Sequence, residues 1–239
     1  MNSPGKIGAF FDVDGTLVVP PSLEWQFVGY LLGRDAIGST EIGRWLVQCA
    51  KDLLRDPRAA ISGNKMHLAG LRESLVDDWA NSVAPDSLQL FPAGVERVAW
   101  HLAQRHRVFL ISGTLKPLAE VSARRLPGSV EICATNLEML GGHWTGRLAG
   151  EHMGGEAKAR AIRGLAARFG LALWDSYAYG NSITDLPMLD SVGHRVAVNP
   201  SASLRRIARK EGWQSCDWAE AVAASTDGAA RRLSPKAAR

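Results

Sequence analysis

The hydrophobic residues nearest the start of the chain form a short run, Ile7–Asp12, which includes Phe10 and Phe11 and is soon followed by Gly15. The run is too short for a helix, and its apolar residues do not alternate with polar ones. This pattern is typical of a strand buried on both faces of a parallel sheet. We therefore predict a buried strand close to the start of the chain.

The pattern changes between about residues 22 and 90, where apolar residues recur at intervals of three and four. That period is the period of a helix with one apolar face. Gly33, Pro57 and Gly63 interrupt the pattern, and no strand-like run appears in this segment. The predicted helices are Leu23–Leu32, Thr40–Leu54 and Met66–Trp79.

After Pro92, short strand patterns alternate with longer helix patterns, as in βαβ units. The predicted strands are Val108–Ile111, Val130–Ala134, Ser176–Gly180 and Arg195–Val198. The predicted helices are Ala93–Arg105, Pro117–Leu126, Glu156–Phe169, Ile183–Leu189 and Ser203–Lys210. Gly141 and Gly142 separate two further strand patterns, Glu138–Leu140 and Trp144–Leu148, and predict a hairpin because glycine accepts the positive φ of a tight turn.

This order predicts an α/β fold, a doubly wound Rossmann-like parallel sheet with a helical cap inserted after the first strand. We expect the α/β core in residues 1–20 and 91–227, the cap in residues 21–90 and a disordered basic tail in residues 228–239. A length of 239 residues, about 1.6 typical domains, suits one core with one large insertion.

The net charge of +4 is the one feature of the composition that points to nucleic acid, and its position argues against that interpretation. Four of the 28 basic residues follow Asp227, and the rest of the chain holds 24 basic and 24 acidic residues. The four are Arg231, Arg232, Lys236 and Arg239. We therefore predict no binding of nucleic acid.

The cysteines and the apolar runs of the chain indicate the cellular compartment in which the protein is expected. Cys49, Cys133 and Cys216 have neither the spacing of a metal site nor the even number of a disulfide framework. The first residues lack the apolar core of a secretory leader, and no uncharged apolar run reaches about 18 residues. We expect a cytoplasmic protein without a membrane span.

Asp12 and Asp14 directly follow the first predicted strand, in the sequence DVDGT. A calcium loop of the EF-hand type would need Gly and Glu where Leu17 and Leu23 stand, so that interpretation fails. Two carboxylates this close repel each other unless they share a cation. The pair therefore indicates a functional site, and capping of a turn is the structural alternative.

Polar residues also follow the later strands or begin the helices after them. Ser112 and Gly113 end the second predicted strand, where a hydroxyl and backbone N–H groups suit an anion or cap a helix. Lys158 lies in the first turn of a predicted helix. A lysine at such a position is either a solvated side chain or part of the site. Asn181 and Asp185 are four residues apart and lie on one side of a helical turn.

Together these segments resemble the four motifs of the haloacid dehalogenase superfamily of phosphohydrolases, in the expected order. The resemblance runs from about Ile7 to Asn199, and the segment NLEMLGGHWTGRLAG is similar to subfamily IB, which includes the phosphoserine phosphatases. It implies a phosphatase with a Rossmann-like core and a cap of the first type. Because relatives that cleave carbon–halogen bonds lack the second aspartate, Asp14 favours a phosphate ester.

The resemblance also implies roles for single residues. Asp12 is the implied nucleophile and Asp14 the general acid and base. Ser112, Gly113 and Lys158 are the implied phosphate-binding residues. The implied cofactor is Mg²⁺, with Asp12, Asp14, Asn181 and Asp185 as its ligands, and the implied partner is a small-molecule phosphate ester.

Two departures from the family pattern concern the metal and the substrate. Many relatives carry Asp at position 181, so Asn181 removes one negative charge and is expected to weaken Mg²⁺ binding. Phosphoserine phosphatases hold the substrate amine with a glutamate seven residues after the second aspartate, a position that Pro21 occupies here, with Glu24 three residues later. Phosphoserine hydrolysis and a catalytically weak phosphate-binding module therefore remain as alternatives.

The aromatic residues of the chain are expected to have structural roles rather than roles in the site. Trp25, Trp45 and Trp79 belong to the predicted cap, where tryptophan more often packs in a core than stacks on a substrate. His101 and His106 have charged neighbours in the sequence and are predicted to be solvated.

Overall fold

Strand β1 (Gly8–Phe11) lies inside a six-stranded sheet in which every paired strand is parallel to its neighbour. The computed structural model describes residues 6–38, 40, 42–43, 45–47 and 65–219. The other strands of this sheet are β2 (Arg107–Leu115), β3 (Glu131–Thr135), β6 (Tyr177–Gly180), β7 (His194–Val198) and β8 (Gln214–Cys216). The strand order is β3-β2-β1-β6-β7-β8, so the chain builds one half of the sheet outward from β1 and then returns to build the other.

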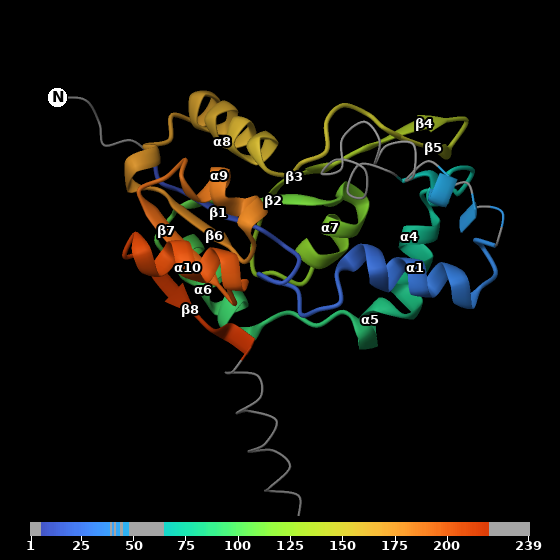
Figure 1. Ribbon diagram of the computed structural model, residues 1–239, viewed down its shortest axis with the longest axis horizontal. Helices are drawn as coiled ribbons and strands as arrows, with labels where there is room; N and C mark the ends of the chain where they lie inside the picture. The colour runs from blue at the N-terminus through green and yellow to red at the C-terminus, as the bar shows by residue number, and fades with distance from the viewer. Residues whose placement is uncertain (1–5, 39, 41, 44, 48–64, 220–239) are drawn as a thin grey trace, which may run out of the picture.

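Helices cover both faces of this sheet, because successive strand residues point to opposite sides. Phe11 packs in the cluster that contains Val98 of α6 (Pro92–Ala103) and Leu118 of α7 (Lys116–Ala123). Phe10 packs in a second cluster. That cluster draws residues from α8 (Glu156–Phe169), α9 (Leu186–Leu189) and α10 (Ala202–Lys210). The predicted doubly wound α/β sheet is confirmed (Figure 1).

The helical segment that follows β1 lies at one end of the molecule, away from β8 and α10 (Figure 1). Its described elements are α1 (Leu23–Gly33), the 3-10 helix η1 (Met66–Leu68), α4 (Leu75–Ser82) and α5 (Ala84–Ser87). Most of the predicted helix Thr40–Leu54, together with Cys49 and the basic tail, lies outside the described residues.

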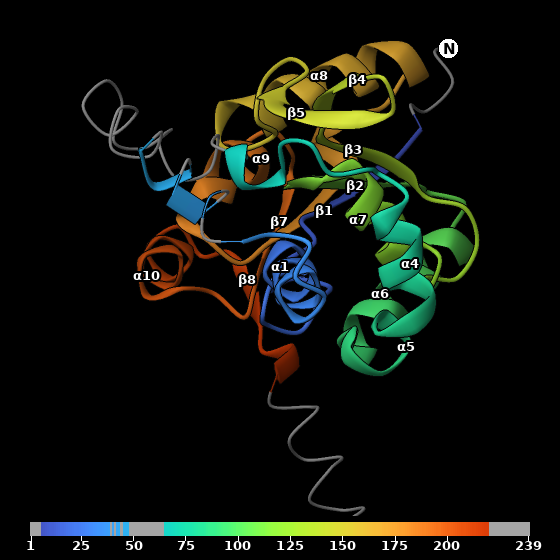
Figure 2. The same ribbon diagram turned by 90° about the vertical axis from the view of Figure 1, so that its right-hand side faces the viewer.

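The predicted helix Met66–Trp79 is not continuous, because only its two ends are helical, in η1 and in α4. Gly70 has a φ of +86° and its N–H donates to the Trp144 carbonyl, while the Trp144 N–H donates to the Leu71 carbonyl. These bonds attach the chain to β5 (His143–Leu148), which pairs with β4 (Leu137–Leu140) in the predicted hairpin. The hairpin lies over η1 and α4 at that end of the molecule (Figure 2).

Other elements differ from the predictions in extent. Strand β2 continues past Ile111 to Leu115, with a register shift against β3 between Ser112 and Leu115. The predicted helix Ile183–Leu189 consists of a 3-10 turn, η3 (Ile183–Asp185), followed by α9. A second 3-10 turn, η2 (Leu173–Asp175), precedes β6, and the short strand β8 was not predicted.

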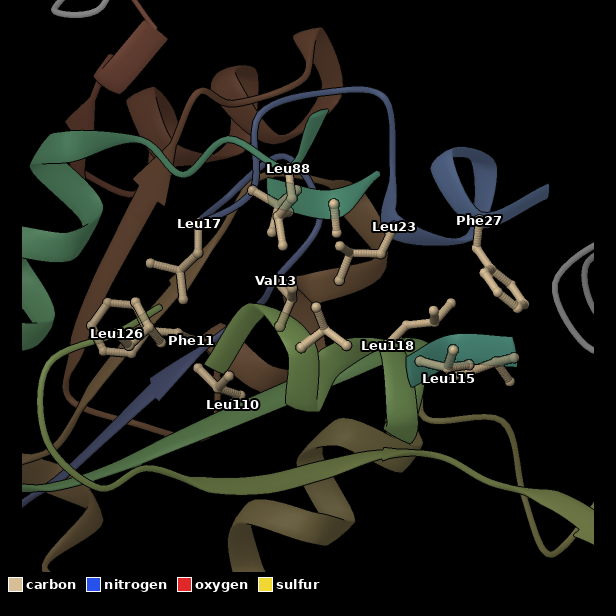
Figure 3. Packing of buried hydrophobic residues seen from close by; sticks show 14 of the residues in the cluster. Phe11, Val13, Leu17, Leu23, Phe27, Leu88, Leu110, Leu115, Leu118 and Leu126 are labelled. Atoms are coloured by element: carbon tan, nitrogen blue, oxygen red, sulfur yellow. The ribbon is translucent and has the colours of Figure 1, made fainter. Parts of the chain in front are cut away.

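A single hydrophobic cluster extends from the sheet into the helical segment. It joins Phe11 and Leu110 of the sheet to Leu118 of α7 and to Phe27 of α1 (Figure 3). Trp79 of α4 belongs to the same cluster and is fully buried. This continuous packing fixes α1 and α4 relative to the carboxyl ends of β1 and β2. Among the described residues, no helix has the length and apolar character that crossing a membrane requires.

Candidate active site

Asp12 stands directly after β1, and its side chain is almost fully buried. Its Oδ1 accepts a hydrogen bond from Lys158 Nζ at 2.6 Å, and its Oδ2 accepts one from Thr16 Oγ1 at 3.0 Å. Burial, with the charge of Asp185 nearby, raises the pKa of Asp12 to about 6, although Lys158 opposes this rise. Asp12 is therefore a fixed carboxylate, in contact with a cation, at the end of a buried strand.

Gly15 brings the loop after β1 against the end of β6. Its φ is +77°, and a Cβ atom at this position would lie 2.0 Å from Asn181 Nδ2. Asn199 holds the same loop from the other side, because its Nδ2 donates to the Gly15 carbonyl at 3.1 Å while its Oδ1 accepts from Trp218 N. The amide of Asn181 thus approaches the backbone between Asp14 and Thr16.

Asp14 lies at the boundary between this loop and α1. Its Oδ1 accepts a hydrogen bond from the Leu23 N–H at 2.8 Å, at the start of that helix. Burial, together with the nearby charges of Asp12 and Glu24, raises the pKa of Asp14 to about 7. Asp14 is therefore a carboxyl group that can hold or release a proton near neutral pH.

Lys158 connects the first and fourth predicted segments of the site. Only 3% of it is exposed, and its Nζ lies 2.6 Å from both Asp12 Oδ1 and Asp185 Oδ1. Burial opposes its positive charge, but the two carboxylates together raise the pKa of Lys158 above its usual value. Lys158 is therefore a buried cation rather than a solvated side chain.

Asp185 uses both carboxylate oxygens within the protein. Its Oδ1 binds Lys158, and its Oδ2 accepts hydrogen bonds from the N–H groups of Asn181 and Ser182 and from Ser182 Oγ. The bond from the Ser182 N–H forms part of a capping box at η3. Asp185 thus orients Lys158 and fixes the turn that carries Asn181.

Ser112 and Gly113 lie within β2 rather than at the cap of α7, which has no side-chain cap. Ser112 Oγ accepts from the Thr114 N–H at 3.2 Å. The Gly113 carbonyl accepts from Thr135 Oγ1 at 2.7 Å, and the same hydroxyl accepts from the Met153 N–H. Thr135 therefore joins the end of β2 to the segment just before Lys158.

A cavity of about 1130 Å³ lies over these residues. Asp12, Asp14, Ser112, Lys158 and Asn181 all line it. Gly113 and Asp185 belong to its lining as well. The structure thus brings together all seven of the site residues that the sequence predicts.

Other residues of the site were not predicted. Thr16, Thr135 and Asn199 hold its loops through hydrogen bonds, and His152 lines the cavity beside Gly113. Burial, with Lys65 and Lys158 nearby, lowers the pKa of His152 to about 4, so its ring is neutral near pH 7. The Thr residue in DVDGT was a signal for Thr16, whereas no sequence pattern marks the others.

Two expectations about aromatic residues need correction. His101 is fully buried and not solvated, because its Nε2 lies 2.8 Å from Tyr179 Oη and its Nδ1 lies 2.8 Å from His106 Nδ1. Trp79 packs in the core as expected. Trp25 is 66% exposed and lines the cavity, as does the half-buried Trp45.

Comparison with known proteins identifies the family that this geometry serves. A family model described as haloacid dehalogenase-like hydrolase matches residues 9–190, which include all seven site residues. The chain belongs to this family. It is 36% identical to phosphoserine phosphatase SerB1 of Mycobacterium tuberculosis over 223 residues, or 88% of this chain and 70% of that protein. It is 32% identical to a probable phosphatase of the same organism over 218 residues, or 87% of this chain and 74% of the relative.

Solved structures agree with the fold of this haloacid dehalogenase-like hydrolase. A protein of unknown function from Bordetella pertussis Tohama I is 28% identical, with a TM-score of 0.73 over 90% of this chain and 100% of that one. A phospho-aspartyl intermediate analogue of phosphoserine phosphatase is 20% identical, with a TM-score of 0.61 over 90% of this chain and 94% of that one. At that identity the second likeness supports the fold alone. The family and the relatives make the protein an enzyme, a phosphatase of the phosphoserine-phosphatase-like type.

Proposed function

We propose that this phosphatase hydrolyses a small phosphate monoester in two steps, with Asp12 as the nucleophile and Mg²⁺ as the cofactor. The observation that carries the proposal is the contact between Asp12 Oδ1 and Lys158 Nζ, 2.6 Å, in the wall of the cavity. The buried cation attracts a phosphate group to the carboxylate that is to attack it.

The two steps use the carboxylates of Asp12 and Asp14. An oxygen of Asp12 attacks phosphorus, the bond between phosphorus and the ester oxygen breaks, and Asp14 gives its proton to the leaving alcohol. Water then attacks the phosphorus of the aspartyl-phosphate, Asp14 takes a proton from that water, and inorganic phosphate leaves. A pKa of about 7 suits Asp14 to both roles, since the group is protonated and deprotonated in comparable amounts near pH 7.

The phosphate group is proposed to bind between β2 and α8. Ser112 contributes a hydroxyl, Gly113 a backbone N–H, and Lys158 a positive charge toward the phosphoryl oxygens. Gly113 suits this position because a Cβ atom there would lie 2.9 Å from His152 Cε1, so a larger residue would displace the ring beside the phosphate site.

The residues of the site fit Mg²⁺, which prefers oxygen ligands and retains several waters. Among the described residues, no three His, Cys, Asp or Glu side chains form a metal site by themselves. We therefore propose the Asp12 carboxylate, the Asp14 backbone carbonyl and the Asn181 amide oxygen as ligands, with water completing the shell. When bound, the ion would neutralise charge on the phosphoryl group.

Asp185, also a predicted metal ligand, has a different set of contacts. Both of its oxygens accept hydrogen bonds from protein groups, so we propose that it acts mainly by positioning Lys158 and Asn181. Direct binding of Mg²⁺ by Asp185 stays a prediction. The expected weakening of Mg²⁺ binding by Asn181 also stays a prediction.

We further propose that residues 21–90 act as a cap on a core of residues 1–20 and 91–227. Cavity-lining residues come from both segments, including Trp25 from the first and Ser112 from the second. A cap over the site excludes water and contacts the leaving group. A cytoplasmic location and the absence of nucleic-acid binding remain predictions.

Phosphoserine hydrolysis is a second candidate, because a relative 36% identical to this chain is a phosphoserine phosphatase. A phosphate-binding module with weak turnover is a third, and Asn181 is the observation that favours it. Inorganic phosphate release from phosphoserine, measured beside release from other esters, separates the second candidate from a broader esterase. Failure to turn over any member of a broad ester panel would favour the third.

The central test is the release of phosphate from p-nitrophenyl phosphate with and without Mg²⁺. Asp12→Asn keeps the size of the side chain but removes the nucleophile, and we expect turnover to fall by about three orders of magnitude or more. Asp86→Asn, an exposed acidic residue on α5, is the matched control and should retain full activity. A phosphorylated peptide containing Asp12, recovered by rapid acid quench, would identify the intermediate. Full activity in Asp12→Asn would overturn the proposal.

A further inference from the structure

The cavity over Asp12 has two chemically different halves. The half formed by the carboxyl ends of the strands and by the start of α8 is polar, with Asp12, Ser112, Lys158 and Asn181. The half formed by the helical segment is mainly apolar. Its apolar residues are Trp25, Val28, Leu32, Ile37, Ile42 and Trp45. A phosphate bound in the polar half would direct its leaving group toward this apolar wall.

The apolar wall includes side chains that the fold itself does not cover. Trp25 is 66% exposed and Leu32 is 46% exposed, although both belong to α1, whose opposite face packs Phe27 and Leu31 in the core. Exposed apolar side chains gathered around a concave site are typical of a ligand-binding surface. The volume of about 1130 Å³ also exceeds what a phosphate and a three-carbon alcohol fill.

The charged residues of the apolar half neutralise each other. Lys65 Nζ forms an ion pair with Glu24 Oε2, and Lys65 is 5% exposed. Because the charges of this pair balance each other, they give the apolar half no net charge with which to attract an ionised leaving group. The pair is therefore compatible with a neutral alcohol.

Two polar atoms of this half have no hydrogen-bond partner among the described residues. They are Glu24 Oε1 and His67 Nδ1, and each is buried. Both residues line the cavity, and the edge of the His67 ring meets Trp45 with the ring centroids 5.8 Å apart. Buried polar atoms without partners are unfavourable, so a ligand with a hydroxyl or amide here would satisfy them.

We infer that the natural substrate is a phosphate monoester of a neutral, largely apolar alcohol that is larger than serine and carries few polar groups. This inference rests on the proposed function, because it places the reacting phosphate at Asp12. It specifies the class of leaving group that the cavity accepts. The apolar wall that α1 forms with Ile37, Ile42 and Trp45 determines this specificity.

A series of ethyl, butyl, hexyl and octyl phosphate tests the inference directly, with inorganic phosphate release as the readout. Each methylene that moves from water to the apolar wall should raise kcat/KM about three- to fourfold, until the wall is filled. Phosphoserine should have a lower kcat/KM than hexyl phosphate. A kcat/KM that is independent of chain length, or highest for phosphoserine, would overturn the inference.

Leu32→Gln tests the wall itself, and the exposure of Leu32 makes the variant unlikely to unfold. It should reduce the increase in kcat/KM per methylene, so that the ratio of kcat/KM for octyl phosphate to that for ethyl phosphate falls below the ratio of the parent. Leu46→Gln is the matched control, because Leu46 is 55% exposed in the same segment and is not among the residues that line the cavity. An unchanged chain-length dependence in Leu32→Gln and in Trp25→Gln would contradict the assigned wall.

These outcomes separate the inference from the proposed function. If Asp12→Asn abolishes hydrolysis of every ester while chain length has no effect, only the inference fails. If Asp12→Asn retains activity, the proposed function fails whatever the chain-length dependence. Circular dichroism and the thermal midpoint of each variant confirm that the compared proteins are equally folded.

Discussion

Burial raises the pKa of Asp14 to about 7, from 3.8 for an aspartate in an unfolded chain. The folded protein therefore binds this proton more tightly than the unfolded chain does between these two values. By linkage, the contribution of Asp14 to stability is complete below pH 3.8 and is lost as the pH rises through 7. At pH 8 the folded protein holds an ionised, buried carboxylate, and this state reduces the free energy of unfolding.

Asp14→Asn should therefore stabilise the metal-free enzyme at pH 8 while it reduces turnover. The amide keeps an acceptor for the Leu23 N–H and carries no charge, so we expect a gain of about 1–3 kcal/mol in the free energy of unfolding. Urea unfolding in EDTA at pH 8 measures this gain, which should be much smaller at pH 5. Asp86→Asn, which removes an exposed charge, serves as the control. Equal gains in the free energy of unfolding at both pH values would contradict the raised pKa of Asp14.

Gly15 shows how one backbone position can determine the geometry of the site. Gly15→Ala would place a methyl group 2.0 Å from the present position of Asn181 Nδ2 and would strain a backbone with a φ of +77°. We expect kcat/KM to fall by about a hundredfold, because displacement of Asn181 alters the site. Gly212→Ala separates the two effects, since Gly212 has a φ of +66° and no atom within 4 Å of its Cβ position.

Steady-state kinetics measure the activity of the two glycine variants, and thermal unfolding measures their stability. Both variants should lose about 1 kcal/mol of stability through backbone strain, and only Gly15→Ala should lose activity. If Gly212→Ala loses as much activity as Gly15→Ala, general destabilisation rather than the contact with Asn181 is the cause.

The sequence predicts single residues best where a short motif follows a buried strand. Asp12 and Asp14 follow β1 directly, so their meeting with Asn181 after β6 follows from the parallel order of the two strands. The burial of His101 could not be predicted in this way, because its partner Tyr179 is 78 residues away. The pairing of Glu24 with Lys65 was also missed, since it spans 41 residues without a periodic signal.

At the scale of elements, Thr135 of β3 connects two parts of the site. Its hydroxyl donates to the Gly113 carbonyl and accepts from the Met153 N–H, so it holds the end of β2 against the segment that leads to α8. These contacts occur where β2 and β3 lose their regular register. The phosphate-binding part of β2 therefore depends on a side chain of the neighbouring strand.

Thr135→Val keeps the shape of the side chain and removes the hydrogen bonds of its hydroxyl with Gly113, Met153 and His152 Nδ1. We expect the inhibition constant of inorganic phosphate to rise about tenfold, because Gly113 is no longer held in place. Ser122→Ala removes another buried hydroxyl, which donates to the Ala119 carbonyl on α7. It should lose comparable stability without a change in the inhibition constant. Equal inhibition constants in Thr135→Val and the parent would show that Thr135 has no positioning role.

The elements divide into those that local patterns predict and those that contacts across the fold determine. The alternation after Pro92 predicted the parallel strands and the hairpin, because hydrophobic period and glycine turns are local signals. The predicted helix Met66–Trp79 failed because Gly70 and Leu71 bond to Trp144 instead of continuing a helix. Strand β8 has only three residues, none of them strongly apolar, so no local pattern marks it.

At the scale of the whole molecule, one histidine, His101, is buried in the core. His101 belongs to α6, and its ring packs in a cluster of rings that includes His106 and, from β6, Tyr177 and Tyr179. Burial, together with the nearby charges of His106 and Arg97, lowers the pKa of His101 to about 3. In the unfolded chain the pKa is 6.5, so acid protonates the unfolded chain first. The stabilising contribution of His101 is complete above pH 6.5 and is lost as the pH falls toward 3.

His101→Gln should therefore lower stability at pH 7.5 while it reduces the sensitivity of the fold to acid. The variant loses ring contacts with Tyr179 and His106, but the parent should lose about 2 kcal/mol more than the variant between pH 7.5 and pH 5. Asp12 and Asp14 act in the opposite direction over this range, and their effect cancels in the comparison because both proteins retain them. His194→Gln, which changes an exposed ring stacked on Tyr177, should follow the parent at every pH. Parallel curves of unfolding free energy against pH for His101→Gln and the parent would show that His101 does not carry this acid sensitivity.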